Sequence, residues 1–218
     1  GTLRRAFVGP GDQWGIVRVA SGPDSFLRWD KDWQSVLPNI ARDFRLGDDH
    51  RTLTLFLRRG MRWSDGAPFT AADIMFWYED LYLDRRIVSA PSPSLRIDNQ
   101  DIRIEMVDEY TVRFVSPLPY EVLAEFLASS TDLGGQSFYG RFGMGGYAPK
   151  HYLSQFHPKY RSETEVSASA REQGFANWSI YLRNRNDWTL NPELPVLSPW
   201  RLVEPINSQK FSLDRNPY

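Results

Sequence analysis

The chain has 218 residues, of which 41% are hydrophobic and 14% aromatic, enough apolar surface for one large or two modest globular units. A net charge of −1 and 24% charged residues describe an ordinary protein surface and argue against a nucleic-acid-binding protein, which would carry a basic patch. Cysteine is absent, which excludes disulfides, cysteine nucleophiles and cysteine-ligated zinc.

Residues 3–8 are predicted to form a short strand, which ends at Gly9-Pro10. Residues 25–44 mix two tryptophans with charged residues and predict no regular element. From Arg51 to Arg58 the leucines alternate with polar residues, the pattern of a strand buried on one face.

The turn Trp63-Ser64-Asp65-Gly66 follows, with Gly66 suited to a positive φ. Thr70 and Asp73 then have the spacing of a capping box, which predicts that a helix begins at residue 71. This helix is expected to run to about Asp84. Its apolar residues recur at i, i+3, i+4 and i+7, and its acidic residues, Glu79, Asp80 and Asp84, are expected to face solvent.

Alternation over residues 102–106 and 112–114, with Asp108-Glu109 between them, predicts a β-hairpin that pairs with the strand at 53–57. Pro119 favours a helix over residues 120–128. Further helices are predicted over 149–156 and 165–185, and a strand pair near 201–203 and 211–213. Helices and strands do not alternate regularly, so the predicted fold class is α+β.

The segment from Gly134 to Gly146 holds six of the fifteen glycines. Glycine lets the backbone adopt positive φ and lets other atoms approach closely. We therefore expect this segment to be a loop, a hinge or a place where the backbone approaches a ligand.

No enzyme or metal motif is found. The three histidines have no zinc-binding spacing and are expected to be exposed or to cap helices. Gly143 to Ala148 formally matches a dinucleotide motif but lacks a preceding apolar strand, and no Walker sequence or GxSxG elbow occurs. We predict no catalytic residue, no metal site and no cofactor.

The run from Asp48 to Ile74 closely resembles the signature of the family 5 extracellular solute-binding proteins. Leu57 to Asp73 follows the family pattern L-R-x-G-x-x-W-S-D-G-x-P-F-T-A-x-D. Asp108 to Phe114 is similar to its D-x-Y-T-V-x-F strand, Pro149 to Leu153 to its P-K-H-Y-L, and Arg215 to Tyr218 to its R-N-P-Y. Leu197-Ser198-Pro199-Trp200 departs from the usual G-T-G-P-Y in a way that resembles one subgroup.

The resemblance implies a periplasmic binding protein-like fold of class II, family 5 type, in which two lobes close like a hinge on a solute. Members are about twice this length or more, so we expect a truncated chain, with the second lobe after Tyr218. Residues 1–32 and 146–218 are expected to form part of lobe I, and residues 33–145 an accessory subdomain that holds the signature.

Trp63, Asp65, Gly66, Phe69 and Thr70 of the signature are interpreted as residues that specify the fold, through a turn, packing and a helix cap. Aromatic residues in loops are better candidates for ligand contact, because ring faces stack on sugars and cover peptide side chains. The ligand-binding candidates are Trp29, Tyr139, Tyr147 and Trp200.

The leading hypothesis is a monomeric, non-enzymatic receptor that captures an oligopeptide or similar-sized solute for an ABC permease. Its alternatives are an oligosaccharide receptor of the same family, favoured by eight tryptophans, and a secreted glycan-degrading enzyme. The sequence contains no run of about 18 apolar residues, so no transmembrane helix is predicted, and residues 1–5 are not a signal peptide. The resemblance implies a periplasmic or cell-surface location, with a signal sequence, and in some members a lipid anchor, preceding Gly1.

Overall fold

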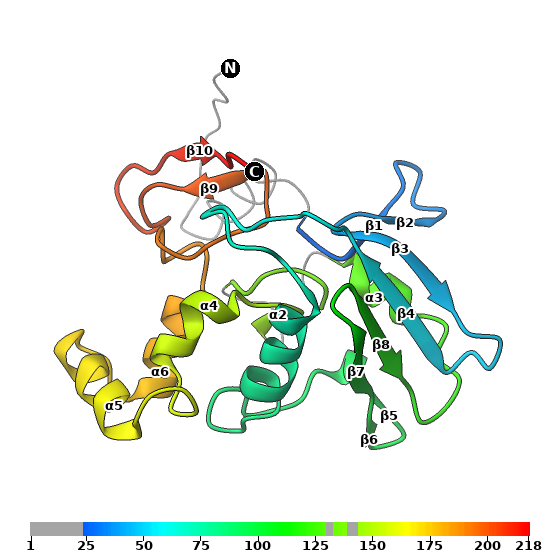
Figure 1. Ribbon diagram of the computed structural model, residues 1–218, viewed down its shortest axis with the longest axis horizontal. Coiled ribbons are helices and arrows are strands. Elements are labelled where there is room, and N and C mark those ends of the chain that lie inside the picture. The colour runs from blue at the N-terminus through cyan, green and yellow to red at the C-terminus, as the bar shows by residue number, and fades with distance from the viewer. Residues whose placement is uncertain (1–23, 130–132, 139–143) are drawn as a thin grey trace.

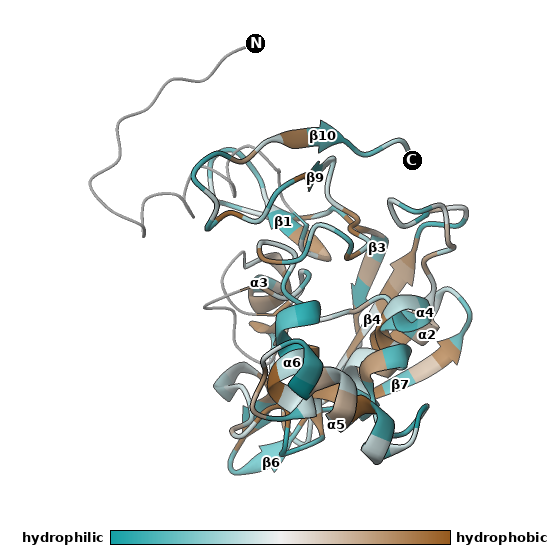
Figure 2. Ribbon diagram, turned by 90° about the vertical axis from the view of Figure 1, so that its left-hand side faces the viewer, coloured by the Kyte–Doolittle hydropathy of each residue, from teal (hydrophilic) through white to brown (hydrophobic). Residues whose placement is uncertain are grey.

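The computed structural model describes residues 24–129, 133–138 and 144–218. Its largest sheet has four antiparallel strands in the order β3-β4-β8-β7 (Figure 1). These strands are β3 (Ala41–Leu46), β4 (Thr52–Leu57), β7 (Arg103–Asp108) and β8 (Thr111–Val115). The predicted strand, the hairpin and their pairing are confirmed, since Leu53 lies opposite Phe114 and Leu55 opposite Val112. Figure 2 shows β4 mostly in the hydrophobic colour.

One helical segment crosses beside this sheet. It consists of α2 (Ala71–Met75) and the π-helix η1 (Phe76–Tyr82), so the predicted helix is confirmed. Its capping box is present: Thr70 Oγ1 accepts the Ala72 N–H at 3.3 Å, and the Asp73 carboxylate accepts the Thr70 N–H at 3.1 Å.

The expectation that Asp80 faces solvent is wrong. Asp80 is only 5% exposed, because the helix has a second buried face that Phe76 and Asp80 share. The Tyr160 ring lies 5.9 Å from that of Phe76, and the Tyr160 hydroxyl donates to Asp80 at 2.5 Å. The apolar periodicity of one segment did not reveal that residues 157–160 cover it from the other side.

Several short elements surround these two units. The strands β1 (Leu27–Trp29) and β2 (Val36–Pro38) form a hairpin, as do β5 (Arg96–Ile97) and β6 (Gln100–Asp101), and η2 (Pro93–Leu95) is a 3₁₀-helix. Of these, none was predicted. Helix α3 (Leu123–Ala128) begins three residues later than expected, because the Tyr120 N–H donates to the His50 carbonyl at 2.7 Å and holds that residue beside the sheet.

The rest of the chain is mainly helical and lies at the other end of the molecule from the sheet (Figure 1). It contains α4 (Lys150–Leu153), the 3₁₀-helix η4 (Ser154–Phe156), α5 (Glu163–Glu172) and α6 (Trp178–Arg185). The predicted single helix over 165–185 is therefore wrong. Gly174 has φ +80°, which ends the first helix, and Asn177 caps the second by accepting the Ile180 N–H at 2.9 Å.

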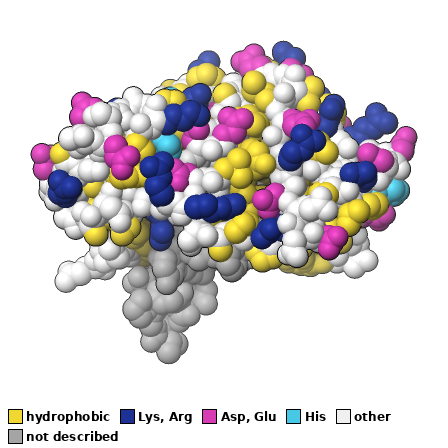
Figure 3. Space-filling model, turned by 90° about the horizontal axis from the view of Figure 1, so that it is seen from below, with side chains coloured by type: hydrophobic (Ala, Val, Ile, Leu, Met, Phe, Trp, Pro, Cys, Tyr) yellow, Lys and Arg dark blue, Asp and Glu magenta, His cyan; other side chains and the backbone are white. Residues whose placement is uncertain are grey.

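A predicted strand pair is confirmed as β9 (Trp200–Leu202) and β10 (Leu213–Arg215). The fold class is α+β, as expected. The buried apolar residues of the described ranges form one cluster that includes sheet, helices and the segment before β9. The division into part of lobe I and an accessory subdomain stays a prediction, and the predicted strand at 3–8 lies outside the described residues. Seen from below, acidic, basic and hydrophobic side chains are interspersed (Figure 3).

Candidate functional site

The signature aromatics form the centre of the core. Trp63, Phe69 and Tyr147 are each 0% exposed, and their rings meet edge to face with centroids 5.5 to 5.8 Å apart. The Tyr147 hydroxyl also donates to the Asp24 carbonyl at 2.6 Å. This packing supports the interpretation that the signature specifies the fold.

Asp73 joins three segments beneath this cluster. Its carboxylate accepts the Thr70 N–H and the Lys150 N–H, each at 3.1 Å, and the Trp63 indole N–H at 3.3 Å. Burial raises the pKa of Asp73, while these hydrogen bonds act to lower it. The helix cap, the signature turn and the start of α4 are therefore held by one side chain.

In the described part of the glycine-rich segment, backbone lies against backbone. The Gly146 N–H donates to the Gly135 carbonyl at 2.8 Å, and residues 136 and 147 form a parallel bridge. A Cβ on Gly145, whose φ is +84°, would lie 2.2 Å from the Gly135 oxygen. On Gly134 it would lie 2.4 Å from the Leu127 oxygen. At these positions glycine is required by close packing between main-chain segments.

The three predicted ligand contacts that the structure describes, Trp29, Tyr147 and Trp200, are not brought together. Trp29 is partly exposed on β1, with its ring 5.9 Å from that of Trp33, which is 71% exposed. Trp200 is 40% exposed on β9, and the two strands lie apart in Figure 1. Tyr147 is buried in the core, and Tyr139 lies outside the described residues. Ligand contact by these four residues stays a prediction.

A different group stands out by its unmet hydrogen bonds. Asn186 is 0% exposed, yet both its amide atoms lack a partner, and so does the indole nitrogen of Trp188, a residue that is 5% exposed. The Trp188 ring lies 6.3 Å from the Phe138 ring, and the backbone N–H of Trp188 donates to the Ser137 carbonyl at 3.2 Å. We call Ser137, Phe138, Asn186 and Trp188 the Asn186–Trp188 site.

Buried polar groups are normally hydrogen-bonded, so this site has capacity for an ordered water or a ligand hydroxyl. The free groups of these four residues are uncharged, an amide that donates and accepts and an indole that donates, while Nε of the neighbouring Arg185 guanidinium also lacks a partner. No local pattern pointed to this site, because residues 186–190 fall between predicted elements and carry no motif.

One ion pair borders the site. The guanidinium of Arg185 donates to the Tyr152 hydroxyl and to the Glu193 carboxylate. The Asn191 amide donates to the Arg185 carbonyl at 2.7 Å and to the Tyr152 hydroxyl at 3.0 Å. This network fixes the backbone at the end of α6, and so fixes where Asn186 lies.

A buried polar cluster lies elsewhere, beside η1. His157, expected to be exposed or a cap, is only 3% exposed; its Nδ1 accepts the Lys159 N–H at 3.1 Å and its Nε2 lies 3.0 Å from the Asp80 carbonyl. Burial lowers the pKa of His157. The Asp80 carboxylate accepts from Lys159 Nζ and the Tyr160 hydroxyl, both at 2.5 Å. Since these groups are partnered with one another, we interpret the cluster as structural.

The other two histidines form exposed pairs, His50 with Glu121 and His151 with Asp65. Over residues 24–129, 133–138 and 144–218, no group of three or more His, Cys, Asp or Glu side chains is placed to hold a metal ion. Within the same ranges, no helix has the length and hydrophobicity needed to cross a membrane.

Several known proteins are similar to this chain in sequence or in fold. The periplasmic alpha-galactoside-binding protein of Rhizobium meliloti is 30% identical over 184 residues, 84% of this chain and 22% of that protein. A solved structure of an oligopeptide-binding protein, OppA, is 34% identical with a TM-score of 0.82, covering 100% of this chain and 32% of that one.

The binding protein MelB of Agrobacterium fabrum, solved with stachyose, is 24% identical with a TM-score of 0.63, covering 91% of this chain and 27% of that one, a likeness of fold alone. This chain thus spans between a fifth and a third of the length of these relatives. Residues 35–218 match the family described as bacterial extracellular solute-binding proteins, family 5 Middle. The resemblance seen in the sequence is confirmed, and the chain belongs to this family of solute-binding proteins.

Proposed function

We propose that the protein is the solute-binding component of an ABC importer. It works outside the cytoplasmic membrane, captures its solute between this part of the chain and a second lobe, and delivers it to the permease subunits. Closure needs a solute that contacts both lobes, because only a difference in binding free energy between open and closed states shifts their populations. Membership of the solute-binding family supports this proposal.

The solute that the site supports best is an uncharged oligosaccharide. The observation that carries this is the Asn186–Trp188 site, where the unpartnered Trp188 indole lies beside the Phe138 ring and the unpartnered Asn186 amide is two residues away in the chain. Sugar hydroxyls both donate and accept, as a carboxamide does, and the C–H faces of a sugar ring suit aromatic neighbours. A relative named for binding alpha-galactosides, 30% identical over most of the chain, gives independent support.

An oligopeptide is the second candidate. A structure named as an oligopeptide-binding protein is 34% identical and covers the whole chain. Peptide backbones also present donors and acceptors that an amide such as Asn186 would satisfy.

Thermal-shift measurements on the complete receptor test both candidates, with stachyose in one series and mixed tri- to pentapeptides in the other. We expect stachyose to raise the melting temperature, and Asn186→Ala to reduce that rise. Asn184→Ala is the matched control: it removes the same amide two residues away, where no hydrogen bond of the side chain is present among the described residues. Stabilisation by peptides alone would favour the second candidate, and turnover of either ligand would contradict the receptor proposal.

A further inference from the structure

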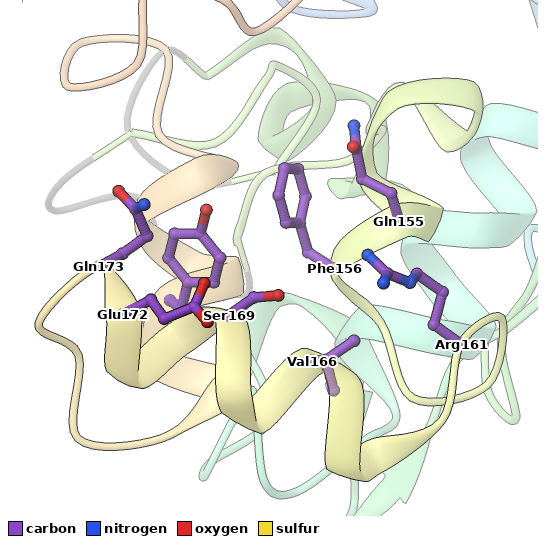
Figure 4. A pocket seen from close by; sticks show the side chains of 8 residues that line it. Gln155, Phe156, Arg161, Val166, Ser169, Glu172 and Gln173 are labelled. Atoms are coloured by element: carbon purple, nitrogen blue, oxygen red, sulfur yellow. The ribbon is translucent and has the colours of Figure 1, made fainter.

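A cavity of about 190 Å³ lies in the helical part of the molecule and shares no residue with the Asn186–Trp188 site (Figure 4). Its walls come from three helices and one link. They are Gln155 and Phe156 of η4, Arg161, then Val166, Ser169, Glu172 and Gln173 at α5, and Tyr181 of α6.

The floor of the cavity is apolar and firmly built. The rings of Phe156 and Tyr181 meet edge to face with centroids 5.3 Å apart, and Val166 is buried at 2% exposure. Tyr181 is held from its other side by Phe175, 5.0 Å away, and burial raises the pKa of its phenol, which therefore stays a neutral hydroxyl. The floor thus offers a ring surface and one hydroxyl.

The polar groups that line the cavity have hydrogen-bonding capacity to spare. Across the described residues, no hydrogen bond of the Ser169 hydroxyl, the Tyr181 hydroxyl or the Gln173 amide is present. In Figure 4, Arg161 and Glu172 lie on opposite sides of the opening. The pairing of Arg161 with Glu165 is long, at 3.7 Å, and both side chains are exposed, so its guanidinium keeps free donors.

We propose that this cavity is a second solute-binding site, which takes one monosaccharide-sized polyol. Its volume is below the roughly 300 Å³ at which pockets for drug-sized ligands begin, and it suits a single ring. Free groups that both donate and accept match hydroxyls around such a ring, while Phe156 and Tyr181 offer apolar contact to its C–H face. The ring is either a free monosaccharide or the terminal residue of a longer glycan.

This inference does not rest on the proposed function, because the cavity is complete within this chain and uses no residue of the main site. With about 0.3 kcal/mol per non-hydrogen atom, a ligand of about twelve such atoms binds with a dissociation constant on the order of millimolar. Saturation-transfer NMR detects binding in that range.

The experiment uses the 218-residue chain with galactose as the free monosaccharide and stachyose as the longer glycan. We expect saturation transfer to the sugar. Ser169→Gln should abolish it by filling the cavity with a longer side chain, while Ser167→Gln on the same helix, at a residue that does not line the cavity, should leave it unchanged. Tyr181→Phe removes only a hydroxyl and should weaken binding roughly 2- to 10-fold.

If both sugars show saturation transfer, and only Ser169→Gln abolishes it, a free monosaccharide is enough to occupy the cavity. If stachyose alone shows transfer, the ligand is the terminal residue of a longer glycan. The proposal is overturned if neither sugar shows transfer, or if Ser169→Gln, with the circular dichroism of the unaltered chain, retains it. If Asn186→Ala does not change the thermal shift of the complete receptor, that result contradicts the Asn186–Trp188 site and does not affect the proposal for this cavity.

Discussion

The indole N–H of Trp63 donates a hydrogen bond to the Asp73 carboxylate, and this 3.3 Å contact joins the signature turn to the helix that follows it. The Asp73 carboxylate also accepts hydrogen bonds from the backbone N–H groups of Thr70 and Lys150. Two residues of the signature thus act on each other inside the core. Their contact, with the Lys150 N–H on the same carboxylate, holds the starts of α2 and α4 together.

Replacing Asp73 should be costly. Asp73→Ala leaves the Trp63, Thr70 and Lys150 donors without this acceptor, and unsatisfied buried donors cost about 1–3 kcal/mol each, without full additivity. We expect a loss of about 3–5 kcal/mol in the free energy of unfolding, measured by urea denaturation. Glu79→Ala, at an exposed position of the same helical segment, should change it by less than about 0.5 kcal/mol. Equal effects of the two variants would contradict the role given to Asp73.

Gly145 and Gly174 allow conformational strain to be separated from steric overlap. Both have positive φ, +84° and +80°, but a Cβ on Gly145 would lie 2.2 Å from the Gly135 oxygen, whereas on Gly174 it would meet nothing within 4 Å. Gly174→Ala should therefore cost only the left-handed conformation, about 1–2 kcal/mol. Gly145→Ala should cost clearly more. Denaturation curves that show the same loss for both would mean that the main-chain contact relaxes freely.

Stability should fall in mild acid because of His157. Burial lowers its pKa below the ordinary value of 6.5, so the folded protein keeps the imidazole neutral while the unfolded chain takes up a proton. The contribution is complete above pH 6.5 and is lost as the pH falls through the lowered pKa of the folded state.

Urea denaturation between about pH 7.5 and pH 5 measures this loss. His157→Gln should flatten the pH dependence, while His50→Gln, at an exposed histidine, should retain it. A steep profile that persists in His157→Gln would assign the effect to the carboxylates instead.

Binding of the main solute should need the second lobe. We expect the 218-residue chain to bind stachyose or peptides at the Asn186–Trp188 site at least about 100-fold more weakly than the complete receptor, because the contacts that favour closure are missing. Calorimetry on both proteins, each carrying Ser169→Gln to remove the second cavity, gives the ratio. Affinities that differ by less than about 10-fold would contradict this expectation.

Local patterns in the sequence predicted those helices and strands whose determining residues lie close together in the chain. The alternation of Leu53, Leu55 and Leu57 and the capping box at Thr70 both describe features completed within a few residues. Asp80 could not be placed, because its partners, Lys159 and Tyr160, are about eighty residues away and cover a face that helix periodicity leaves open.

Strand β3 and the buried Asn186 were also missed, because both depend on contacts with residues outside their own segments. Strand β3 follows from pairing with β4, since the exposed Arg42, Asp43 and Arg45 hide its alternation. Asn186 is an ordinary polar residue in the sequence. Only its burial without a partner marks it, and burial depends on packing around α6 that no single segment encodes.

The contact between Gly135 and Gly146 limits which substitutions protein engineering can introduce in this part of the chain. Residues 134–136 and 145–147 are joined by a main-chain hydrogen bond, a parallel bridge and close glycine contacts. Any redesign of residues 133–138 or 144–148 must therefore keep glycine at positions 134 and 145, since a Cβ there would overlap a main-chain oxygen.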